Sequence, residues 1–224
     1  MPSPAAWIGT QFRAVSAAAK YGLRPWRVAV RAIRRHGAVQ RIPELAGLVS
    51  RVAAVRPKVV VEVGTRLGGT FSCWPAVSAP DALLVSIDLP AGSFGGGSGD
   101  DVVRKLGTYL RPGQTLECLR QDSHLPATRD WLVGVLAGRP IDFLFLDGDH
   151  SLAGVGRDFE AFGPLVAPGG LVAFHDIVPE PDNAHIQVPE FWAALRGRYE
   201  SAEFIDPPGR AEGGMGIGVI RIGS

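Results

Sequence analysis

Short apolar runs alternate with amphipathic segments along most of the chain. The run KVVVEVG at 58–64 is rich in β-branched residues and too short for a typical helix. Similar runs lie at 83–88, 115–120, 141–147 and 169–176. Segments with helical spacing lie between them, near 69–79, 101–110, 127–137, 152–165 and 188–198. Apolar strands separated by helices predict an α/β fold, with a mostly parallel sheet covered on both faces.

The chain closes with two further short apolar runs. AEFID at 202–206 and GIGVIRI at 216–222 are joined by a short connection rich in Gly and Pro. Such a pattern predicts an antiparallel pair at the end of the sheet. The pattern therefore indicates a Rossmann-like sheet whose last strand runs against the others.

Helical patterns precede the first strand, at 10–21, 24–36 and 43–55. In the second of them, Trp26, Val30 and Ile33 recur on one face, and arginines with the same spacing occupy another. We therefore divide the chain into an N-terminal basic helical arm or lid at 1–57 and a main domain at 58–224.

Charge is distributed unevenly between these parts, although the net charge is only +1. Residues 1–58 hold eleven Lys and Arg and one acid, whereas the remainder holds twelve basic and twenty-one acidic residues. The arm either packs on the main domain or on a second copy in a homo-oligomer, or it contacts an anionic surface such as a membrane. Nucleic acid is disfavoured as a substrate, because the main domain is acidic and no N-P-P-Y-like tetrapeptide follows the fourth strand.

Features that bear on localisation are few. Cys73 and Cys118 lie far apart without metal-type spacing, which indicates free thiols in a reducing compartment. No apolar run approaches the roughly 20 residues needed to cross a bilayer. Trp7, Gln11 and Arg13 interrupt the N-terminus where a secretory signal needs an apolar stretch. We expect a cytoplasmic protein.

Polar residues follow the predicted strands, where open α/β sheets bind their ligands. The first strand ends in the motif Glu62-x-Gly64-x-x-x-Gly68. Its glycines would let backbone N–H groups approach an anionic ligand. Alternatively, the glycines simply form a tight turn between the strand and the next helix. The spacing is not the G-x-G-x-x-G of dinucleotide binders, which argues against an oxidoreductase. Asp88 ends the second strand, either to bind both hydroxyls of a ribose or to act as a helix cap or surface acid.

The later strand ends carry carboxylates and imidazoles. Asp122-Ser123-His124 would contact an adenine edge or form a turn. The fourth strand ends in Asp147-Gly148-Asp149-His150-Ser151 and the fifth in His175-Asp176. Asp147, His175 and Asp176 could converge on one divalent cation. In the alternative, Asp149 or Ser151 caps the next helix and His175 is a hydrogen-bonded core histidine.

These stretches resemble a known family. VVVEVGTRLGGTF, VSIDLP and IDFLFLDGDHSLAGVGRDFEAFGPLVAPGGLVAFHDI together resemble class I S-adenosylmethionine-dependent methyltransferases. They are most similar to the family 24-like group of cephalosporin-biosynthesis and macrolide-sugar O-methyltransferases. The resemblance covers residues 58–222 and implies a seven-stranded sheet with an antiparallel last strand.

The resemblance also implies roles for the residues at the strand ends. The methionine part of the cofactor would lie among Glu62, Gly64, Thr65 and Gly68. Asp88 would hold the ribose, and Asp122 and Ser123 would lie beside the adenine. Asp147 would sit under the sulfonium and bind magnesium, and His150 would be the general base. Metal-dependent members often carry two acids where this chain has His175 and Asp176. Either Asp147 and Asp176 bind the cation together with water and substrate oxygens, or manganese or iron is preferred, or no metal is needed.

We therefore expect an S-adenosylmethionine-dependent O-methyltransferase with His150 and Asp147 in the catalytic site. A divalent metal, magnesium or manganese, would assist. The acceptor would be a hydroxyl of a small molecule such as a sugar, a phenol or a lipid-linked glycan, covered by the segments 92–100 and 178–192. The alternative is a catalytically silent protein of the same fold that binds a ligand or a membrane surface.

Overall fold

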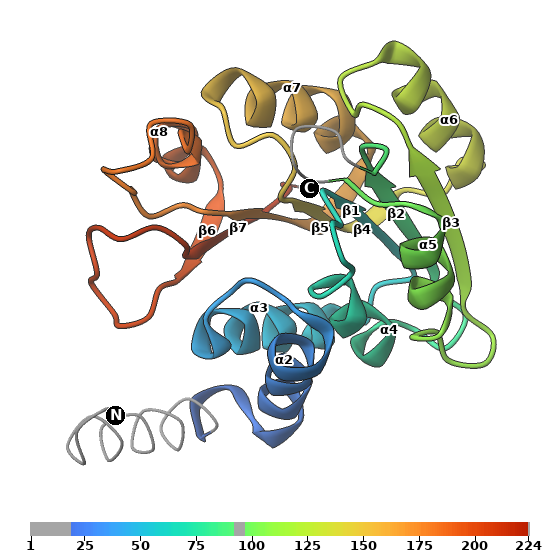
Figure 1. The fold of residues 1–224 in the computed structure, drawn as a ribbon, viewed down its shortest axis with the longest axis horizontal. Helices are drawn as coiled ribbons and strands as arrows, with labels where there is room; N and C mark the ends of the chain where they lie inside the picture. Colours follow the sequence, from blue (N-terminus) through green and yellow to red (C-terminus); the bar gives the residue numbers. More distant parts are fainter. Residues whose placement is uncertain (1–18, 92–96, 224) are drawn as a thin grey trace.

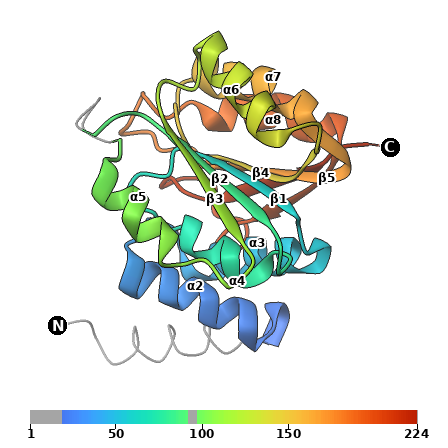
Figure 2. The ribbon, with the colours of Figure 1, turned by 90° about the vertical axis from the view of Figure 1, so that its right-hand side faces the viewer.

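A computed structural model describes residues 19–91 and 97–223 as three layers, with a central sheet between two layers of helices (Figures 1 and 2). The expected helix at 10–21 and the expected loop at 92–100 fall largely outside the described residues. Within the part that is described, none of the helices is long and apolar enough to cross a membrane.

The sheet has seven strands in the order β3-β2-β1-β4-β5-β7-β6. Their bounds are β1 Val59–Val63, β2 Leu83–Asp88, β3 Thr115–Arg120, β4 Ile141–Leu146, β5 Val166–His175, β6 Glu200–Phe204 and β7 Ile217–Arg221. Strands β1 to β5 pair in parallel, and β7 runs antiparallel to both β5 and β6. The predicted Rossmann-like sheet with an antiparallel last strand is confirmed.

Helices cover both faces of the sheet. One layer contains α2 Leu23–His36, α3 Ile42–Val55, the 3-10 turn η1 Phe71–Cys73, α4 Trp74–Val77 and α5 Asp100–Gly107. The other contains α6 Pro126–Leu136, α7 Leu152–Phe162 and α8 Val188–Leu195 with the 3-10 turns η3 Gly163–Leu165 and η4 Arg196–Arg198. Each layer closes its own hydrophobic cluster against one face of the sheet. The two-sided burial explains why β1, β2 and β4 read as almost uninterrupted apolar runs.

The helix expected at 69–79 is broken into η1 and α4. Pro75 lies at the start of α4 and has no N–H to donate to the preceding turn, so a 3-10 turn precedes it. The consequence is a compact connection that brings Thr70 and Trp74 close to the end of β1.

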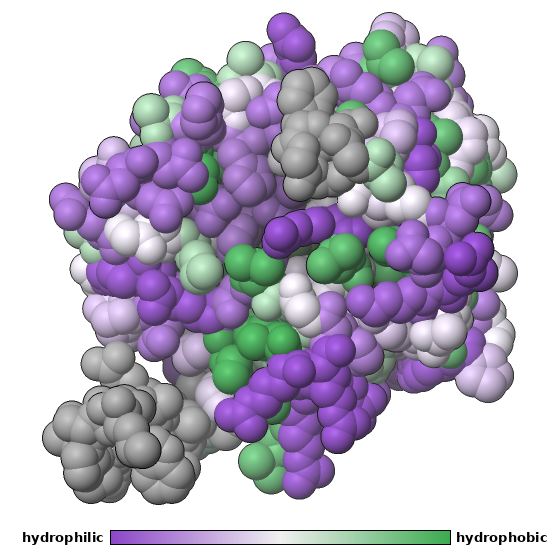
Figure 3. Space-filling view, in the orientation of Figure 1, coloured by the Kyte–Doolittle hydropathy of each residue, from purple (hydrophilic) through white to green (hydrophobic). Residues whose placement is uncertain are grey.

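The N-terminal helices pack directly on the sheet. Ala29 and Ala32 of α2 and Leu45 and Leu48 of α3 are fully buried in the same cluster as Val60 of β1. Hydrophilic side chains gather over the outer side of α2 (Figure 3). Apolar residues of α2 therefore face the core, and its arginines face outward.

Candidate active site

A large cavity of about 1210 Å³ lies at the carboxyl ends of the parallel strands. Strand pairing explains why residues far apart in sequence meet there: Val63 pairs with both Ile87 and Leu146, and Leu146 pairs with Phe174. The polar residues that follow these four positions are thereby brought to one edge. The predicted site residues that line the cavity are Gly64, Thr65, Asp88, Asp122, Ser123, Asp147, His150, His175 and Asp176.

Gly64 allows β1 and β4 to approach closely at the floor of the cavity. Its φ is +86°, and a Cβ atom there would collide with the backbone carbonyl of Asp147. The Gly64 N–H donates to the carbonyl of Ile87 at 2.9 Å, and the Asp147 N–H donates to the carbonyl of Val63 at 2.9 Å. Glycine is thus required by the turn and by the close approach of the strands.

Asp88 presents its carboxylate to the cavity from the end of β2. One oxygen accepts from the Arg66 N–H at 2.7 Å, and the other accepts from the Leu89 N–H at 2.9 Å. Each oxygen keeps a second lone pair for a ligand. This arrangement suits recognition of two neighbouring hydroxyl groups, as expected for a ribose.

Two predicted cofactor residues do not line the cavity. Glu62 is only 1% exposed, and its carboxyl group accepts a hydrogen bond from the Trp74 indole. Burial raises the pKa of Glu62 well above its usual value, although the Trp74 hydrogen bond opposes the shift. Gly68, with φ of +76°, forms the turn after β1, where a side chain would collide with Leu106.

The third strand end forms a turn that borders the cavity. Asp122 accepts from the His124 N–H at 2.9 Å, and its own carbonyl accepts from the Thr128 hydroxyl. The fourth strand end contains the helix cap considered above, because the Ser151 hydroxyl accepts from the Gly154 N–H at 3.0 Å. Asp149 accepts from the Ser151 N–H at 2.9 Å, which stabilises the turn that precedes α7.

Two carboxylates and two imidazoles lie in contact with one another after the ends of β4 and β5. His150 Nε2 lies 3.4 Å from Asp147 Oδ1, and His150 Nδ1 lies 3.2 Å from Asp176 Oδ2. His175 Nδ1 lies 3.2 Å from Asp147 Oδ1 and 3.3 Å from Asp176 Oδ1. His175 is nearly inaccessible, whereas the His150 side chain is 34% exposed and faces the cavity.

These contacts shift the ionisation of the cluster. Burial alone would lower the pKa of His175, but the carboxylates of Asp147 and Asp176 raise it to about 10. Burial alone would raise the pKa of Asp147, but the two histidines lower it to about 2. The hydrogen bond to Asp147 and the nearby carboxylates raise the pKa of His150, against the opposing effect of burial. In the absence of a metal, a protonated His175 lies between Asp147 and Asp176 and offsets one of their two negative charges.

The predicted metal ligands are also found together. Asp147, His175 and Asp176 each offer a ligand atom, and these atoms lie within 4.8 Å of one another. His175 Nε2 is buried without a hydrogen-bond partner among the described residues. Two carboxylates and one imidazole are a donor set that suits manganese or iron better than magnesium. The residues fit a divalent cation, provided that His175 gives up its proton.

Sequence reasoning missed Gln40, which joins the N-terminal arm to the cluster. Its side-chain amide nitrogen lies 3.5 Å from Asp147 Oδ2, and its oxygen accepts from the Thr70 hydroxyl at 2.9 Å. Gln40 belongs to the connection between α2 and α3, so no helical or strand periodicity singled it out. The arm therefore contributes a hydrogen-bonding group at the acidic cluster.

A second missed residue is Asp158, a buried acid on α7 beneath the cavity. Its carboxylate lies 3.5 Å from His124 Nε2, and burial raises its pKa to about 6. A detectable signal existed, because Asp158 interrupts the apolar face formed by Val155, Phe159 and Phe162. Its position ties the third strand end to α7 behind the wall of the cavity.

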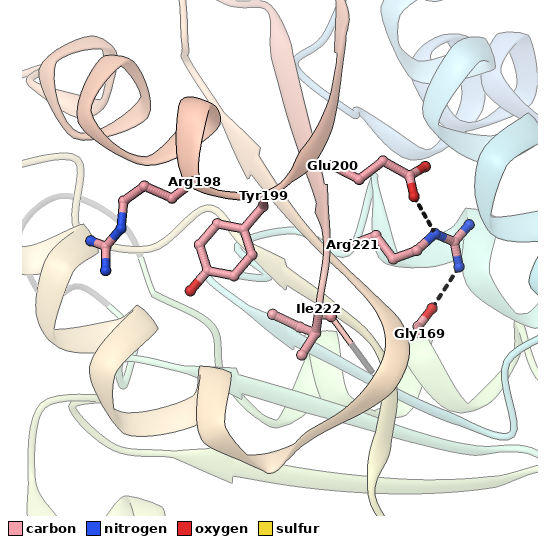
Figure 4. A pocket seen from close by; sticks show the side chains of 7 residues that line it. Gly169, Arg198, Tyr199, Glu200, Arg221 and Ile222 are labelled. Atoms are coloured by element: carbon pink, nitrogen blue, oxygen red, sulfur yellow. Dashed lines mark hydrogen bonds and ion pairs between the residues drawn. The ribbon is translucent and has the colours of Figure 1, made fainter.

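Another hollow, of about 450 Å³, lies at the opposite end of β5, beside the ends of β6 and β7. There Arg221 Nε lies 3.3 Å from Glu200, and Arg221 donates to the carbonyl of Gly169 at 2.7 Å, as Figure 4 shows. Arg51 also pairs with Glu200 at 2.8 Å. Because these charges satisfy one another, the large cavity is the better candidate for an active site.

Comparisons with known proteins identify a family for most of the sheet. Residues 61–177, just over half of the chain, match family 24 of methyltransferase domains. The uncharacterised protein y4gI of Sinorhizobium fredii is 27% identical over 157 residues, which cover 68% of this chain. The chain spans only 16% of the length of that curated relative.

Solved structures share the fold. Cofactor-bound Rv0187 from MTB is 17% identical with a TM-score of 0.58, and the match covers 99% of each chain. An O-methyltransferase from Bacillus cereus in complex with SAH is 16% identical with a TM-score of 0.56, covering 92% of this chain and 90% of that one. MycE methyltransferase from the mycinamycin biosynthetic pathway, in complex with Mg and SAH, is 15% identical with a TM-score of 0.57, covering 89% of this chain and 55% of that one.

The match over the strand ends that build the cavity, together with the seven-stranded topology, establishes the family. The chain belongs to family 24 of methyltransferase domains, within the class I S-adenosylmethionine-dependent methyltransferases.

Proposed function

We propose that the protein transfers the methyl group of S-adenosylmethionine to a hydroxyl group of a small-molecule acceptor, with His150 as the general base. The observation that carries this proposal is the placement of the partly exposed His150 imidazole between Asp147 and Asp176, facing the cavity. A cavity of about 1210 Å³ exceeds the roughly 300–1,000 Å³ of a typical small-molecule site, so donor and acceptor both have room.

The donor side is supported by Gly64, Thr65 and Asp88, which line one part of the cavity. When bound, S-adenosylmethionine supplies an electrophilic methyl group on a sulfonium, and its carbon–sulfur bond breaks as the new carbon–oxygen bond forms. The protein aligns the reacting groups and removes the hydroxyl proton. His150 accepts that proton, and its two carboxylate neighbours stabilise the resulting imidazolium.

A divalent cation would be held by Asp147, His175 and Asp176, and it would lower the pKa of an acceptor hydroxyl. The crystallised MycE complex contains Mg, which supports a metal in this fold. The imidazole of His175 favours manganese in this chain. Residues 1–57 would act as an arm over the acceptor side, supported by the lining residues Gly37, Ala38, Val39 and Gln40. A homo-oligomer belongs to the same proposal and is checked by light scattering.

A label-transfer assay tests the proposed function. The full chain is incubated with S-adenosylmethionine labelled in its methyl group, with manganese or with a chelator. The acceptors offered are sugar, phenolic and lipid-linked hydroxyl compounds, together with amine and thiol compounds. The proposal expects label in at least one acceptor as a methyl ether. Label that appears only on nitrogen or sulfur acceptors would contradict the hydroxyl assignment.

Asp88→Ala is expected to weaken S-adenosylmethionine binding by about 10²-fold or more, because two hydrogen bonds to a charged carboxylate are worth about 1.5–3 kcal/mol each. Isothermal titration calorimetry measures the affinity. The matched control is Asp81→Ala, an exposed acid before β2 whose loss should leave affinity unchanged. Wild-type affinity in Asp88→Ala would show that the ribose is bound elsewhere.

Manganese affinity is expected to increase about tenfold per pH unit from pH 6.5 to 8.5, because binding displaces a proton from His175, whose pKa is about 10. Calorimetry in two buffers of different ionisation enthalpy should count about one released proton per ion. His175→Gln should remove this pH dependence. An affinity independent of pH in the wild type would mean that His175 takes no part in metal binding.

A further inference from the structure

The outer side of α2 carries a stripe of arginines. Arg24, Arg27, Arg31, Arg34 and Arg35 are all exposed, and their spacing places them on one side of the helix. Residues 19–43 contain no acid. Among the described residues, none of these five arginines forms a salt bridge, and Arg24 alone has a partner, the backbone carbonyl of Ala76 at 2.8 Å. The stripe is therefore a concentrated positive charge that the molecule itself does not neutralise.

The stripe is continuous with the mouth of the cavity. Helix α2 ends at His36, and the next four residues, 37–40, line the cavity. Burial lowers the pKa of His36, and the nearby charges of Lys105 on α5 and of Arg31 and Arg35 lower it further. The positive field thus extends from α2 to α5 beside the opening.

Exposed aliphatic side chains accompany this charge. Val39 is 52% exposed and Leu67 is 51% exposed, and both line the cavity. Leu23, at the start of α2, is 65% exposed. In Figure 3, hydrophobic side chains lie beside the hydrophilic group that covers α2. Basic and aliphatic groups therefore share one face.

We propose that this face, formed by the α2 arginines with Leu23, Val39 and Leu67, docks on an anionic lipid bilayer so that the cavity opens toward the membrane surface. The charge is complementary to acidic headgroups, and the three aliphatic side chains can enter the headgroup region. Duplex nucleic acid would satisfy the arginines but would offer nothing apolar to Val39 and Leu67.

The apolar side of α2 does not take part in this contact. Ala29 and Ala32 are fully buried against the protein core, and Trp26 and Ile33 pack on the same cluster. Helix α2 therefore does not lie in the bilayer as an isolated amphipathic helix would. Docking is electrostatic with shallow insertion, and it is reversible and sensitive to salt.

Vesicle sedimentation of the full chain tests the docking, without cofactor or acceptor, so its outcome is independent of the proposed methyl transfer. The probes are vesicles of phosphatidylcholine alone and vesicles with phosphatidylglycerol added, and immobilised duplex DNA is used in a separate retention assay. The wild type should bind the anionic vesicles and release them as salt is raised from about 0.1 to 0.5 M. Replacing Arg27, Arg31 and Arg34 together by Gln should lower the partition coefficient by about 10²-fold.

Matched controls separate this face from a general charge effect. Lys58, Arg157 and Arg198 are exposed elsewhere, and their triple replacement by Gln removes the same charge but should leave vesicle binding almost unchanged. Leu67→Ser should weaken binding about 5-fold, whereas Leu152→Ser, on α7, should not.

Several results would overturn the proposal. These are equal binding to neutral and anionic vesicles, equal losses in the two triple variants, and retention by duplex DNA without retention by vesicles. Circular dichroism of each variant checks that the fold is kept, and a folded triple arginine variant that binds as well as the wild type would be decisive against the docking.

Discussion

Replacing His150 by alanine is expected to lower kcat for methyl transfer by about 10²–10⁴-fold and to leave S-adenosylmethionine affinity within about twofold. The imidazole contacts Asp147 at 3.4 Å and Asp176 at 3.2 Å, and both carboxylates stabilise the imidazolium that forms when the hydroxyl loses its proton. Steady-state kinetics with the acceptor found by the label-transfer assay measures the loss, and calorimetry measures cofactor binding.

The pH profile gives the same experiment a second readout. The neighbouring carboxylates raise the pKa of His150 above 6.5, and a base must be unprotonated to act. In the metal-free wild type, log kcat should rise with pH and level off above pH 6.5, and His150→Ala should lose this step. His185→Ala is the matched control, because His185 lines the same cavity without a carboxylate partner among the described residues. If His150→Ala turns over like the wild type, another group is the base.

Replacing His175 by leucine is expected to destabilise the metal-free protein by about 3–5 kcal/mol at pH 6. The substitution leaves Asp147 and Asp176 buried without the imidazolium that lies 3.2 and 3.3 Å from them. Urea unfolding in the presence of a chelator measures the free energy of unfolding. His185→Leu, on an exposed loop, should change it by less than about 0.5 kcal/mol.

The loss in free energy of unfolding caused by His175→Leu should become smaller at high pH and at very low pH. The pKa of His175 is raised from about 6.5 in the unfolded chain to about 10, so its stabilisation is complete below pH 6.5 and is lost as pH rises toward 10. The pKa of Asp147 is lowered to about 2, so the same interaction is present above about pH 4 and is lost as pH falls toward 2. The pKa shifts of His175 and Asp147 both arise mainly from the ion pair between these two side chains. If the loss in free energy of unfolding caused by His175→Leu grew above pH 8, His175 would be neutral in the folded protein.

The sheet and its ligand-binding edge could be predicted from local patterns, because each is encoded by short segments. The apolar runs that became β2 and β3 have the predicted bounds, and residues at their ends, such as Asp88, line the cavity. The pairing of Val63 with Leu146 then brings distant positions together, as a parallel sheet requires.

Contacts between distant loops were not predictable in the same way. Glu44 of α3 is buried and accepts from Arg210, at 3.0 Å, and from the N–H groups of Asp206 and Gly216. This network fixes the loop that carries Met215 to the cavity wall. Gln40 contacts Asp147, which lies 107 residues away in the sequence. Neither contact has a local periodicity, because both depend on how the N-terminal helices pack on the finished sheet.

The family motif implies that Glu62 and Gly68 contact the cofactor, but the shape of the cavity does not show these roles. Both match the expected spacing, yet Glu62 is bound to Trp74 and Gly68 forms a turn, and neither lines the cavity. Their direct contact with a cofactor remains a prediction.

The orientation of the donor is the central claim, and a crystal structure of the protein with S-adenosylhomocysteine tests it most directly. The account predicts that the ribose hydroxyls bind the Asp88 carboxylate and that the sulfur lies at the Asp147 end of the cavity, with the His150 imidazole facing the position of the missing methyl group. A nucleoside bound in the reverse direction, with its adenine against His150 and its sulfur remote from Asp147, would contradict it.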